Sequence, residues 1–332
     1  MNTFGKLFRV SIIGESHGAC VGAVIDGCPA GIELSAEDML LDLERRKPGA
    51  KGTTTRIEND APLLKSGVFE GKTTGAPILV LFENTNKDSS QYEKLKNIPR
   101  PGHVDLVANK KFGGFNDYRG GGHFSGRLTV ALVAAGVIAK KIIAPVRIET
   151  RLLEVGGSSE IEKAVEKAIK ENDSVGGIVE CRVSGLPVGL GEPFFDSLEA
   201  LLSHAVFSIP AVKGIEFGAG FACAKMHGSE CNDEILDVQG NTKTNNSGGI
   251  NGGISNGNEL IFRVAIKPTS SIGKKQETIN LETGNSTELE TGGQHDACIA
   301  LRVPVVLEAA TAIVIADCML LEQKIPKVYT KR

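Results

Sequence analysis

The sequence predicts a chain of mixed α and β structure, built from two related halves that pack as one unit. Segments of helical length alternate with short β-branched runs along all 332 residues. Residues 27–32 and 185–190 share a Gly-x-Pro-x-Gly pattern, and each follows an expected strand and precedes an expected helix. Gly121-Gly122 and Gly292-Gly293 form a second matched pair. A duplication explains both pairs, with chance matching of short segments as the alternative, and a Rossmann-type βαβ order is disfavoured.

Five helices are expected from capping residues and apolar spacing. Ser35 and Asp38 fit a capping box. The segment that ends before Pro145 has hardly a charge, so it should be a buried helix. Ser159 should cap a helix with one apolar stripe. The expected helices are residues 36–45, 128–143, 160–172, 197–207 and 308–323.

Strands and long loops are expected between these helices. Two connections, residues 235–258 and 270–295, are too polar and glycine-rich for a core, and long ordered loops are usually functional. The expected strands are residues 8–13, 21–25, 77–82, 146–153, 178–183, 214–225 and 260–266.

Composition and motifs exclude several classes of protein. A formal net charge of −3 gives no overall attraction to nucleic acid or to an anionic membrane. Seven scattered cysteines without a C-x-x-C pair, and no uncharged apolar stretch of about 18 residues, indicate a reduced, cytoplasmic protein. Residues 67–73 are one residue short of a P-loop, and residues 218–223 lack the third glycine of a dinucleotide fingerprint. NTPase and dehydrogenase functions are therefore disfavoured.

Two polar segments hold a histidine near glycine or proline. His17 lies in Gly14-Glu-Ser-His-Gly18, where it could donate a proton near neutral pH. A turn whose histidine bonds only the backbone is the alternative. His103 lies in Arg100-Pro-Gly-His-Val-Asp105, whose H-x-D pair could bind a metal, although a lone pair seldom does.

Clusters of cations and glycines indicate anion binding. Five cations between Arg45 and Arg56 form either a solvated helix end or a phosphate clamp. Residues 117–127 place three consecutive glycines and two arginines before the buried helix, which favours a ligand site. Residues 245–254 suit a polar heterocycle, residues 267–271 suit a terminal phosphate, and residues 293–296 add a carboxylate. Together they indicate two phosphate-bearing ligands and no metal.

These segments, in this order, resemble the signature set of the chorismate synthase family. The resemblance rests on residues 14–18, 100–103, 119–127, 248–255, 267–271 and 295–296, and it extends from about Gly5 to Leu320. It implies one α+β domain over residues 1–332, a β-α-β sandwich with helices packed between two mainly antiparallel sheets. It also implies a homotetramer arranged as a dimer of dimers.

The resemblance further implies a lyase of the shikimate pathway to aromatic amino acids. Such an enzyme uses reduced FMN to eliminate phosphate from 5-enolpyruvylshikimate 3-phosphate in a redox-neutral anti-1,4-elimination that gives chorismate. The sequence leaves open whether NADPH reduces the FMN on the protein. Since no reductase domain is visible, an outside reductant is favoured.

Roles for individual residues are implied by the same resemblance. His17 would be the general acid towards the departing phosphate, His103 would protonate or hydrogen-bond the flavin, and Asp296 with Ser16 would assist the proton at flavin N5. The substrate would bind Arg46, Lys51, Arg56, Arg100 and Arg127. The flavin would contact His123, Phe124, Ser125, Asn246, Ser247, Gly252, Lys267, Pro268, Thr269, Ser270, Ser271 and Gln294.

The chain departs from the family pattern, and other functions compete. His123 and Gln294 stand where the family usually has arginine, and Leu128 stands where it has glutamate. A flavin enzyme for another phosphorylated molecule is the main rival. An RNA-binding module that uses the cations from Arg45 to Arg56 is the second, but the net negative charge and 5% aromatic content disfavour it.

Overall fold

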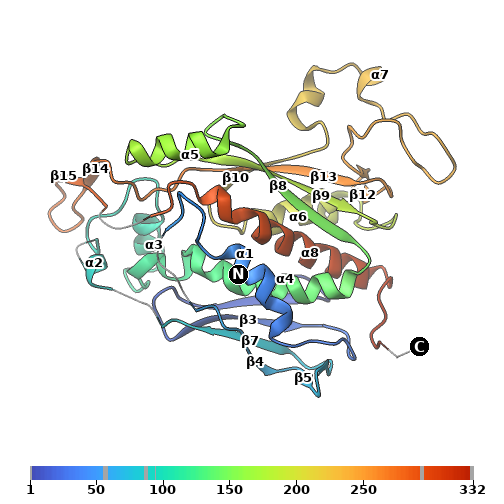
Figure 1. The fold of residues 1–332 in the computed structure, drawn as a ribbon, viewed down its shortest axis with the longest axis horizontal. Coiled ribbons are helices and arrows are strands. Elements are labelled where there is room, and N and C mark those ends of the chain that lie inside the picture. Colours follow the sequence, from blue (N-terminus) through green and yellow to red (C-terminus); the bar gives the residue numbers. More distant parts are fainter. Residues whose placement is uncertain (1, 55–58, 86–88, 94, 292–294, 330–332) are drawn as a thin grey trace.

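The computed structural model describes residues 2–54, 59–85, 89–93, 95–291 and 295–329. Two antiparallel sheets enclose a layer that contains two long helices, α4 (Thr129–Ile143) and α8 (Val303–Leu321) (Figure 1). Helix α4 packs on the first sheet and α8 on the second. The expected α+β sandwich, with helices between two antiparallel sheets, is confirmed.

The first sheet comes from the N-terminal part of the chain and has the strand order β1-β2-β3-β7-β4. Its neighbouring strands are all antiparallel. Ile78, Val80 and Phe82 alternate along β7 and are fully buried, so this face of the sheet meets the helices. The strands are β1 (Thr3–Phe4), β2 (Arg9–Gly14), β3 (Cys20–Asp26), β4 (Leu63–Ser66) and β7 (Ile78–Glu83).

The second sheet comes from the C-terminal part and has the order β10-β13-β9-β8, again antiparallel. Val179, Cys181 and Val183 alternate along β9 and face the helices. The strands are β8 (Arg147–Val155), β9 (Gly177–Ser184), β10 (Val212–Phe217) and β13 (Leu260–Ile266). Small hairpins are β5 (Val68–Phe69) with β6 (Lys72–Thr73), β11 (Ile250–Asn251) with β12 (Ile254–Ser255), and β14 (Gln276–Ile279) with β15 (Ser286–Leu289).

The two long helices cross in close contact. A Cβ atom added to Gly136 would lie 2.3 Å from the Cβ of Ala309, so only glycine at this crossing permits the approach. Residues Ile299–Leu321 are long and apolar enough to cross a membrane by length and composition. Their side chains are mostly buried between the sheets, which accounts for the apolar composition of α8.

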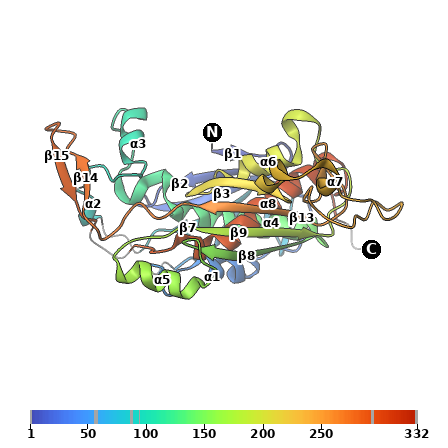
Figure 2. The same cartoon turned by 90° about the horizontal axis from the view of Figure 1, so that it is seen from above.

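The remaining helices cover the core or form the two ends of the molecule. Helix α1 contacts α4 and α8, α6 contacts α8 and β10, and α5 lies on β8. Helices α2 and α3 lie with the β14–β15 hairpin at one end, and α7 lies at the opposite end (Figures 1 and 2). The bounds are α1 (Leu40–Arg46), α2 (Ser90–Glu93), α3 (Asp105–Lys111), α5 (Ile161–Lys170), α6 (Leu198–Val206) and α7 (Gly228–Cys231).

The two halves have the same topology, which confirms the expected duplication. In chain order the main strands are β2, β3, β4 and β7 in the first half and β8, β9, β10 and β13 in the second. They are arranged as β2-β3-β7-β4 and β8-β9-β13-β10. The two Gly-x-Pro-x-Gly segments correspond, because one joins β3 to the α1 region and the other joins β9 to the α6 region. Each half closes with its long helix, α4 or α8.

Several expected boundaries were wrong for local reasons. Strand β10 ends at Phe217, and Gly220–Lys225 forms a 3₁₀ helix instead of continuing the strand. The expected cap at Ser159 is absent: the N-cap residue of α5 is Glu160, the helix has no side-chain capping bond, and Ser158 Oγ accepts the N–H of Glu160 at 3.1 Å in the preceding turn. Helix α8 begins at Val303, ahead of the expected start at Glu308.

Candidate active site

A glycine-rich loop forms the centre of the site. Gly120, Gly121 and Gly122 have φ values of 56°, 81° and 54°, a region that side chains rarely tolerate. A Cβ atom on Gly120 would lie 2.6 Å from Cδ2 of His17, and one on Gly121 would lie 3.6 Å from Cε1 of His103. The loop therefore lies beside both predicted catalytic histidines, and Gly120 leaves no room for a side chain against His17.

The turn of residues 14–18 is fixed by hydrogen bonds from three directions. The N–H of Ser16 donates to the carbonyl of Gly122 at 3.1 Å. Nδ1 of His123 lies 2.7 Å from the carbonyl of Gly14, and because a carbonyl only accepts, His123 donates this bond. Asn84 Nδ2 donates to the carbonyl of Glu15 at 2.9 Å.

His17 itself is almost completely buried, with 1% of its surface exposed. Its Nδ1 lies 2.9 Å from Oγ of Ser89, and the ring of Tyr92 packs edge-on with a centroid distance of 5.0 Å. The Nε2 side faces Gly120, whose added Cβ would lie 2.8 Å from that nitrogen. The ring is thus held on one side and directed towards the glycine loop on the other.

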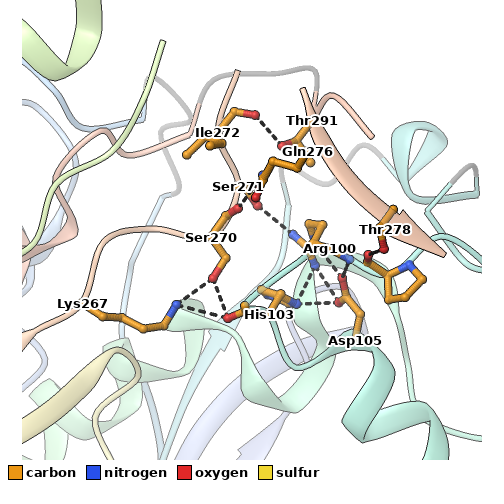
Figure 3. A network of polar contacts seen from close by, with 12 residues as sticks. Arg100, His103, Asp105, Lys267, Ser270, Ser271, Ile272, Gln276, Thr278 and Thr291 are labelled. Atoms are coloured by element: carbon orange, nitrogen blue, oxygen red, sulfur yellow. Dashed lines mark hydrogen bonds and ion pairs between the residues drawn. The ribbon is translucent and has the colours of Figure 1, made fainter. Parts of the chain in front are cut away.

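His103 belongs to a network that joins two distant segments (Figure 3). Nε and Nη2 of Arg100 each lie 2.8 Å from a carboxylate oxygen of Asp105, and Nδ1 of His103 lies 2.5 Å from Oδ1. Burial raises the pKa of Asp105, but the hydrogen bonds from Arg100 and His103 outweigh this effect and hold that pKa well below its usual range. Arg100 Nη1 also donates to Oγ of Ser271 at 3.1 Å.

The loop that follows β13 is tied to the same turn. Lys267 Nζ donates to Oγ of Ser270 at 2.7 Å and to the carbonyl of Gly102 at 3.2 Å. Ser270 Oγ donates to the carbonyl of Gly102 at 2.7 Å. Among the residues that the structure describes, Oγ1 of Thr269 is buried without a hydrogen-bond partner. A buried hydroxyl of this kind suits a ligand atom.

These segments enclose a cavity of about 790 Å³, within the usual range for small-ligand sites. Its walls include apolar side chains from both sheets and from α4 and α8. The predicted site residues that line it are His103, His123, Phe124, Ser125, Lys267, Pro268, Thr269, Ser270 and Ser271. The structure therefore brings most of the predicted flavin positions to one place.

A buried cluster of arginines lies beside the turn that carries His17. Arg46 Nη2 and Arg127 Nη1 each pair with a different oxygen of Asp60, whose side chain is fully buried. Arg127 Nε donates to Asn84, which also holds the residue 14–18 turn. In the described part of the chain, Arg46 Nε and Arg127 Nη2 are buried without a hydrogen-bond partner. Two guanidinium groups with spare donors suit an anion.

Burial and neighbouring charges shift the pKa values of Arg46 and Asp60. Burial lowers the pKa of Arg46 to about 10, although Asp60 opposes this effect, so the side chain stays charged at neutral pH. Burial raises the pKa of Asp60, but Arg46 and Arg127 outweigh it and hold that pKa below its ordinary value. The cluster is therefore cationic at pH 7.

Asp296 lies at the edge of this cluster. Its Oδ1 accepts the N–H of Thr54 at 2.9 Å, and its Oδ2 lies 3.3 Å from Nη1 of Arg302. Arg302 Nε also donates to the carbonyl of Arg46 at 3.0 Å. The carboxylate is thus linked to the arginines, and it does not belong to the residues that line the cavity.

Other predicted residues lie elsewhere. Lys51 is 70% exposed and pairs with Glu166 of α5 at 2.6 Å, away from the buried arginines. Asn246 and Ser247 bind Asp233 through their N–H groups, in the extension of residues 218–249 that contains α7, and Gly252 lies in the turn between β11 and β12. Arg56 and Gln294 lie outside the described residues.

Sequence reasoning missed three residues that the structure places in the site. Asp60, Asn84 and Arg302 hold the arginines and the turn of residues 14–18 in place. None of them lies in a glycine-rich or charged run, so no local signal marks them. Asp105 was noticed as part of an H-x-D pair, and it pairs with both Arg100 and His103.

This combination of a cavity, a glycine loop between two histidines and a buried arginine cluster defines an enzyme site for phosphorylated small molecules. The chain belongs to the chorismate synthase family, a family of carbon–oxygen lyases, since the family model described as chorismate synthase matches residues 8–320.

Similarity to individual proteins agrees with this membership. A chorismate synthase of Chitinophaga pinensis is 64% identical, over 99% of this chain and 99% of the relative. A chorismate synthase of Archaeoglobus fulgidus is 47% identical, over 98% of this chain and 99% of the relative. A crystal structure of chorismate synthase superposes with a TM-score of 0.74 and 25% identity, covering 96% of this chain and 93% of that chain.

Proposed function

We propose that this chain converts 5-enolpyruvylshikimate 3-phosphate into chorismate and inorganic phosphate, with reduced FMN as its cofactor. The observation that carries this proposal is that Gly120 and Gly121 lie beside the two histidines: a Cβ atom on Gly120 would be 2.6 Å from His17, and one on Gly121 would be 3.6 Å from His103. The arginine cluster adjoins the His17 turn, and the cavity adjoins His103. This arrangement suits a substrate phosphate beside a cofactor in a single reaction chamber.

The residues around the cavity fit FMN. The unpartnered hydroxyl of Thr269, with Lys267 and the serines of the same loop, suits the FMN phosphate. Nδ1 of His123 donates to the backbone carbonyl of Gly14, which leaves Nε2 as the ring nitrogen that can hydrogen-bond a ligand. When bound, reduced FMN would supply a transient electron to the substrate and recover it, which leaves the reaction redox-neutral.

The chain's own residues then have separate tasks. Arg46 and Arg127 would bind and orient the phosphate through their spare donors. His17 would donate a proton to the departing phosphate as the carbon–oxygen bond breaks. Asp296 and Ser16 would assist the proton at flavin N5, the role that the family resemblance implies. The buried position of His17 would exclude bulk water from the phosphate.

An anaerobic assay with chemically reduced FMN tests this proposal. Chorismate absorbance and phosphate release should rise in equal amounts without net oxidation of the flavin. Folded protein that binds FMN but releases no phosphate would contradict the proposed substrate and favour a flavin enzyme for another phosphorylated molecule. Repeating the assay with oxidised FMN and NADPH decides whether the protein reduces its own cofactor.

All seven cysteines are free thiols, which supports a reducing, cytoplasmic location.

The position of Asn246 and Ser247 supports a shared site in an oligomer. Gly248 and Gly249, which follow them, contact Glu259 to Ile261 at the start of β13, whereas Lys267 follows its end. Seven residues of strand separate these ends by about 20 Å. We therefore infer that a second copy of the chain supplies Asn246 and Ser247 to the cavity. Exposed apolar side chains of the same extension, such as Phe221 and Val238, support such a contact.

Mixing two inactive variants tests the shared site. His103→Ala and a double variant with Asn246→Ala and Ser247→Ala should each be nearly inactive. If each site combines residues of two copies, random mixing should restore about a quarter of wild-type sites, because mixed pairs contain one intact site. Mixing His103→Ala with His17→Ala is the control and should restore nothing, since both residues come from one chain. Equal recovery in both mixtures, or none in the first, would contradict a shared site.

A further inference from the structure

The side chain of Asp105 determines how His103 can hydrogen-bond. Nδ1 of His103 lies 2.5 Å from Oδ1 of Asp105 and 3.0 Å from Nη2 of Arg100 (Figure 3). A guanidinium group can only donate, and an ionised carboxylate can only accept. The ring nitrogen must therefore either accept from Arg100 or donate to Asp105.

The shorter distance decides between these alternatives. An Nδ1 without a proton would direct its lone pair at a carboxylate oxygen 2.5 Å away, which is strongly repulsive. Nη2 of Arg100 already has an acceptor in Oδ1 of Asp105 at 2.8 Å. Nδ1 of His103 therefore carries the proton and donates it to Asp105.

Asp105 is held in the ionised form that this bond requires. It accepts from Arg100 through Nε, Nη2 and the backbone N–H, at 2.8, 2.8 and 3.1 Å. Its side chain is only 14% exposed, and that of Arg100 is 7% exposed, so solvent weakens this pair little. The other charged group of the network, Lys267, donates to the carbonyl of Gly102, and within the described residues it makes no hydrogen bond to Asp105.

The opposite side of the ring faces the glycine loop. A Cβ atom on Gly121 would lie 3.7 Å from Nε2 of His103, and both residue 103 and the loop border the cavity. With Nδ1 engaged by Asp105, Nε2 is the nitrogen that can exchange a proton or hydrogen bond with a bound molecule.

We propose that Asp105 is a positioning residue that holds neutral His103 as the Nδ1–H tautomer, with Nε2 available to the cavity. Arg100 secures Asp105 and also binds Ser271, so one guanidinium aligns His103 with the loop of residues 267–271. The role of His103 in the reaction rests on the proposed function, whereas the assignment of its tautomer does not.

Spectroscopy of labelled histidine tests the tautomer directly. The chain has six histidines, so loss of a signal in His103→Gln identifies residue 103. The ¹⁵N and ¹³Cδ2 shifts of wild-type protein above the titration range should report Nδ1–H for His103. An Nε2–H tautomer would overturn the proposal. This result is independent of turnover, so an inactive wild-type protein would refute the proposed function and leave the tautomer measurable.

The variant Asp105→Asn tests whether Asp105 sets the tautomer of His103 and thereby supports turnover. An amide offers one acceptor where the carboxylate offers two, and its NH₂ group can donate to Nδ1, so the tautomer should shift towards Nε2–H. Turnover should fall about 10- to 100-fold, as for other residues that orient a functional histidine. FMN affinity should change less, about threefold or below by the same reasoning.

Glu308→Gln is the matched control. Glu308 is also buried and pairs through both oxygens with an arginine, Arg45, but it contacts no histidine in the described structure. It should lose stability without changing the His103 signal. An unchanged tautomer in Asp105→Asn, or equal loss of turnover in both variants, would show that Asp105 is merely structural and overturn the proposal.

Discussion

Replacement of His17 by alanine is expected to lower turnover by about 10²- to 10⁴-fold, the usual contribution of a general acid. His17 is buried and its Nε2 side faces Gly120, whereas the cavity is lined by other residues. FMN affinity should therefore stay within about threefold of wild type, because the ring supplies a proton and not a cofactor contact. Single-turnover phosphate release and a separate titration with FMN measure the two effects.

A further variant makes this result specific. His17→Gln keeps a hydrogen-bonding side chain but cannot donate a proton efficiently, so it should resemble His17→Ala in turnover. Loss of FMN binding in His17→Ala would mean that His17 belongs to the cofactor site, and the assignment as general acid would be wrong.

The elements of the fold were predictable wherever the local pattern was strong. Strand β13 was predicted with its observed bounds because it is a short apolar run, rich in β-branched residues and interrupted by a single charge. Helix α4 was predicted because its apolar run ends before Pro145. Strand β4 was missed because Leu63–Ser66 is short and lies at a sheet edge, where no alternation develops. The start of α8 was placed too late because its first turn contains Pro304, and a helix accepts a proline in its first turn.

The site was predictable in its segments but not in its assembly. Glycines and cations marked the segments that carry His17, His103 and Lys267, and the structure brings these segments together. Pairing between them depends on contacts over long sequence separations, such as Asp60 with Arg127. An isolated aspartate carries no sign of its partner, so Asp60 could not be found from its neighbours in sequence.

The cation-rich run between Arg45 and Arg56 was interpreted either as a phosphate clamp or as a solvated helix end, and each interpretation fits one of its residues. The clamp interpretation suits Arg46, which is buried and joined to Asp60. The interpretation as a solvated surface suits Lys51, which is exposed and paired with Glu166. Arg45 follows neither, because it pairs with Glu308 on α8 and joins the two halves. These three cations lie close together in the sequence and look alike in composition, but they differ in burial and therefore in function.

Asp60→Asn is expected to lower the free energy of unfolding by about 3–5 kcal/mol, the cost of leaving buried partners without their counter-charge. Asp60 pairs with both Arg46 and Arg127, and all three side chains are nearly inaccessible to solvent. The amide would keep one acceptor, but it would leave two guanidinium groups facing each other. Chemical denaturation at pH 7 measures the difference.

The difference in unfolding free energy between wild type and Asp60→Asn should depend on pH in one direction. The pKa of Asp60 in the folded protein lies below the ordinary value of 3.8, because the two arginines outweigh the opposing effect of burial. Such a group stabilises the fold fully above its unfolded pKa and loses that contribution as pH falls through the folded pKa. The gap between wild type and Asp60→Asn should therefore be constant from pH 7 to about 5 and narrow below about pH 4.

Inorganic phosphate provides a further test of the arginine cluster, because an anion can replace the missing carboxylate. In Asp60→Asn, phosphate should raise the melting temperature more than in wild type, since binding to the folded state stabilises it in proportion to affinity. Asp26→Asn is the control: its partner Arg9 is half exposed, so it should cost no more than about 1 kcal/mol and show no added phosphate effect. Equal phosphate effects in all three proteins would show that the buried arginines do not form the anion site.

The pH experiment has its own contradicting outcome. If the difference in unfolding free energy between wild type and Asp60→Asn widens as pH falls, Asp60 is not ionised in the folded protein, and the paired-charge description of the cluster is wrong.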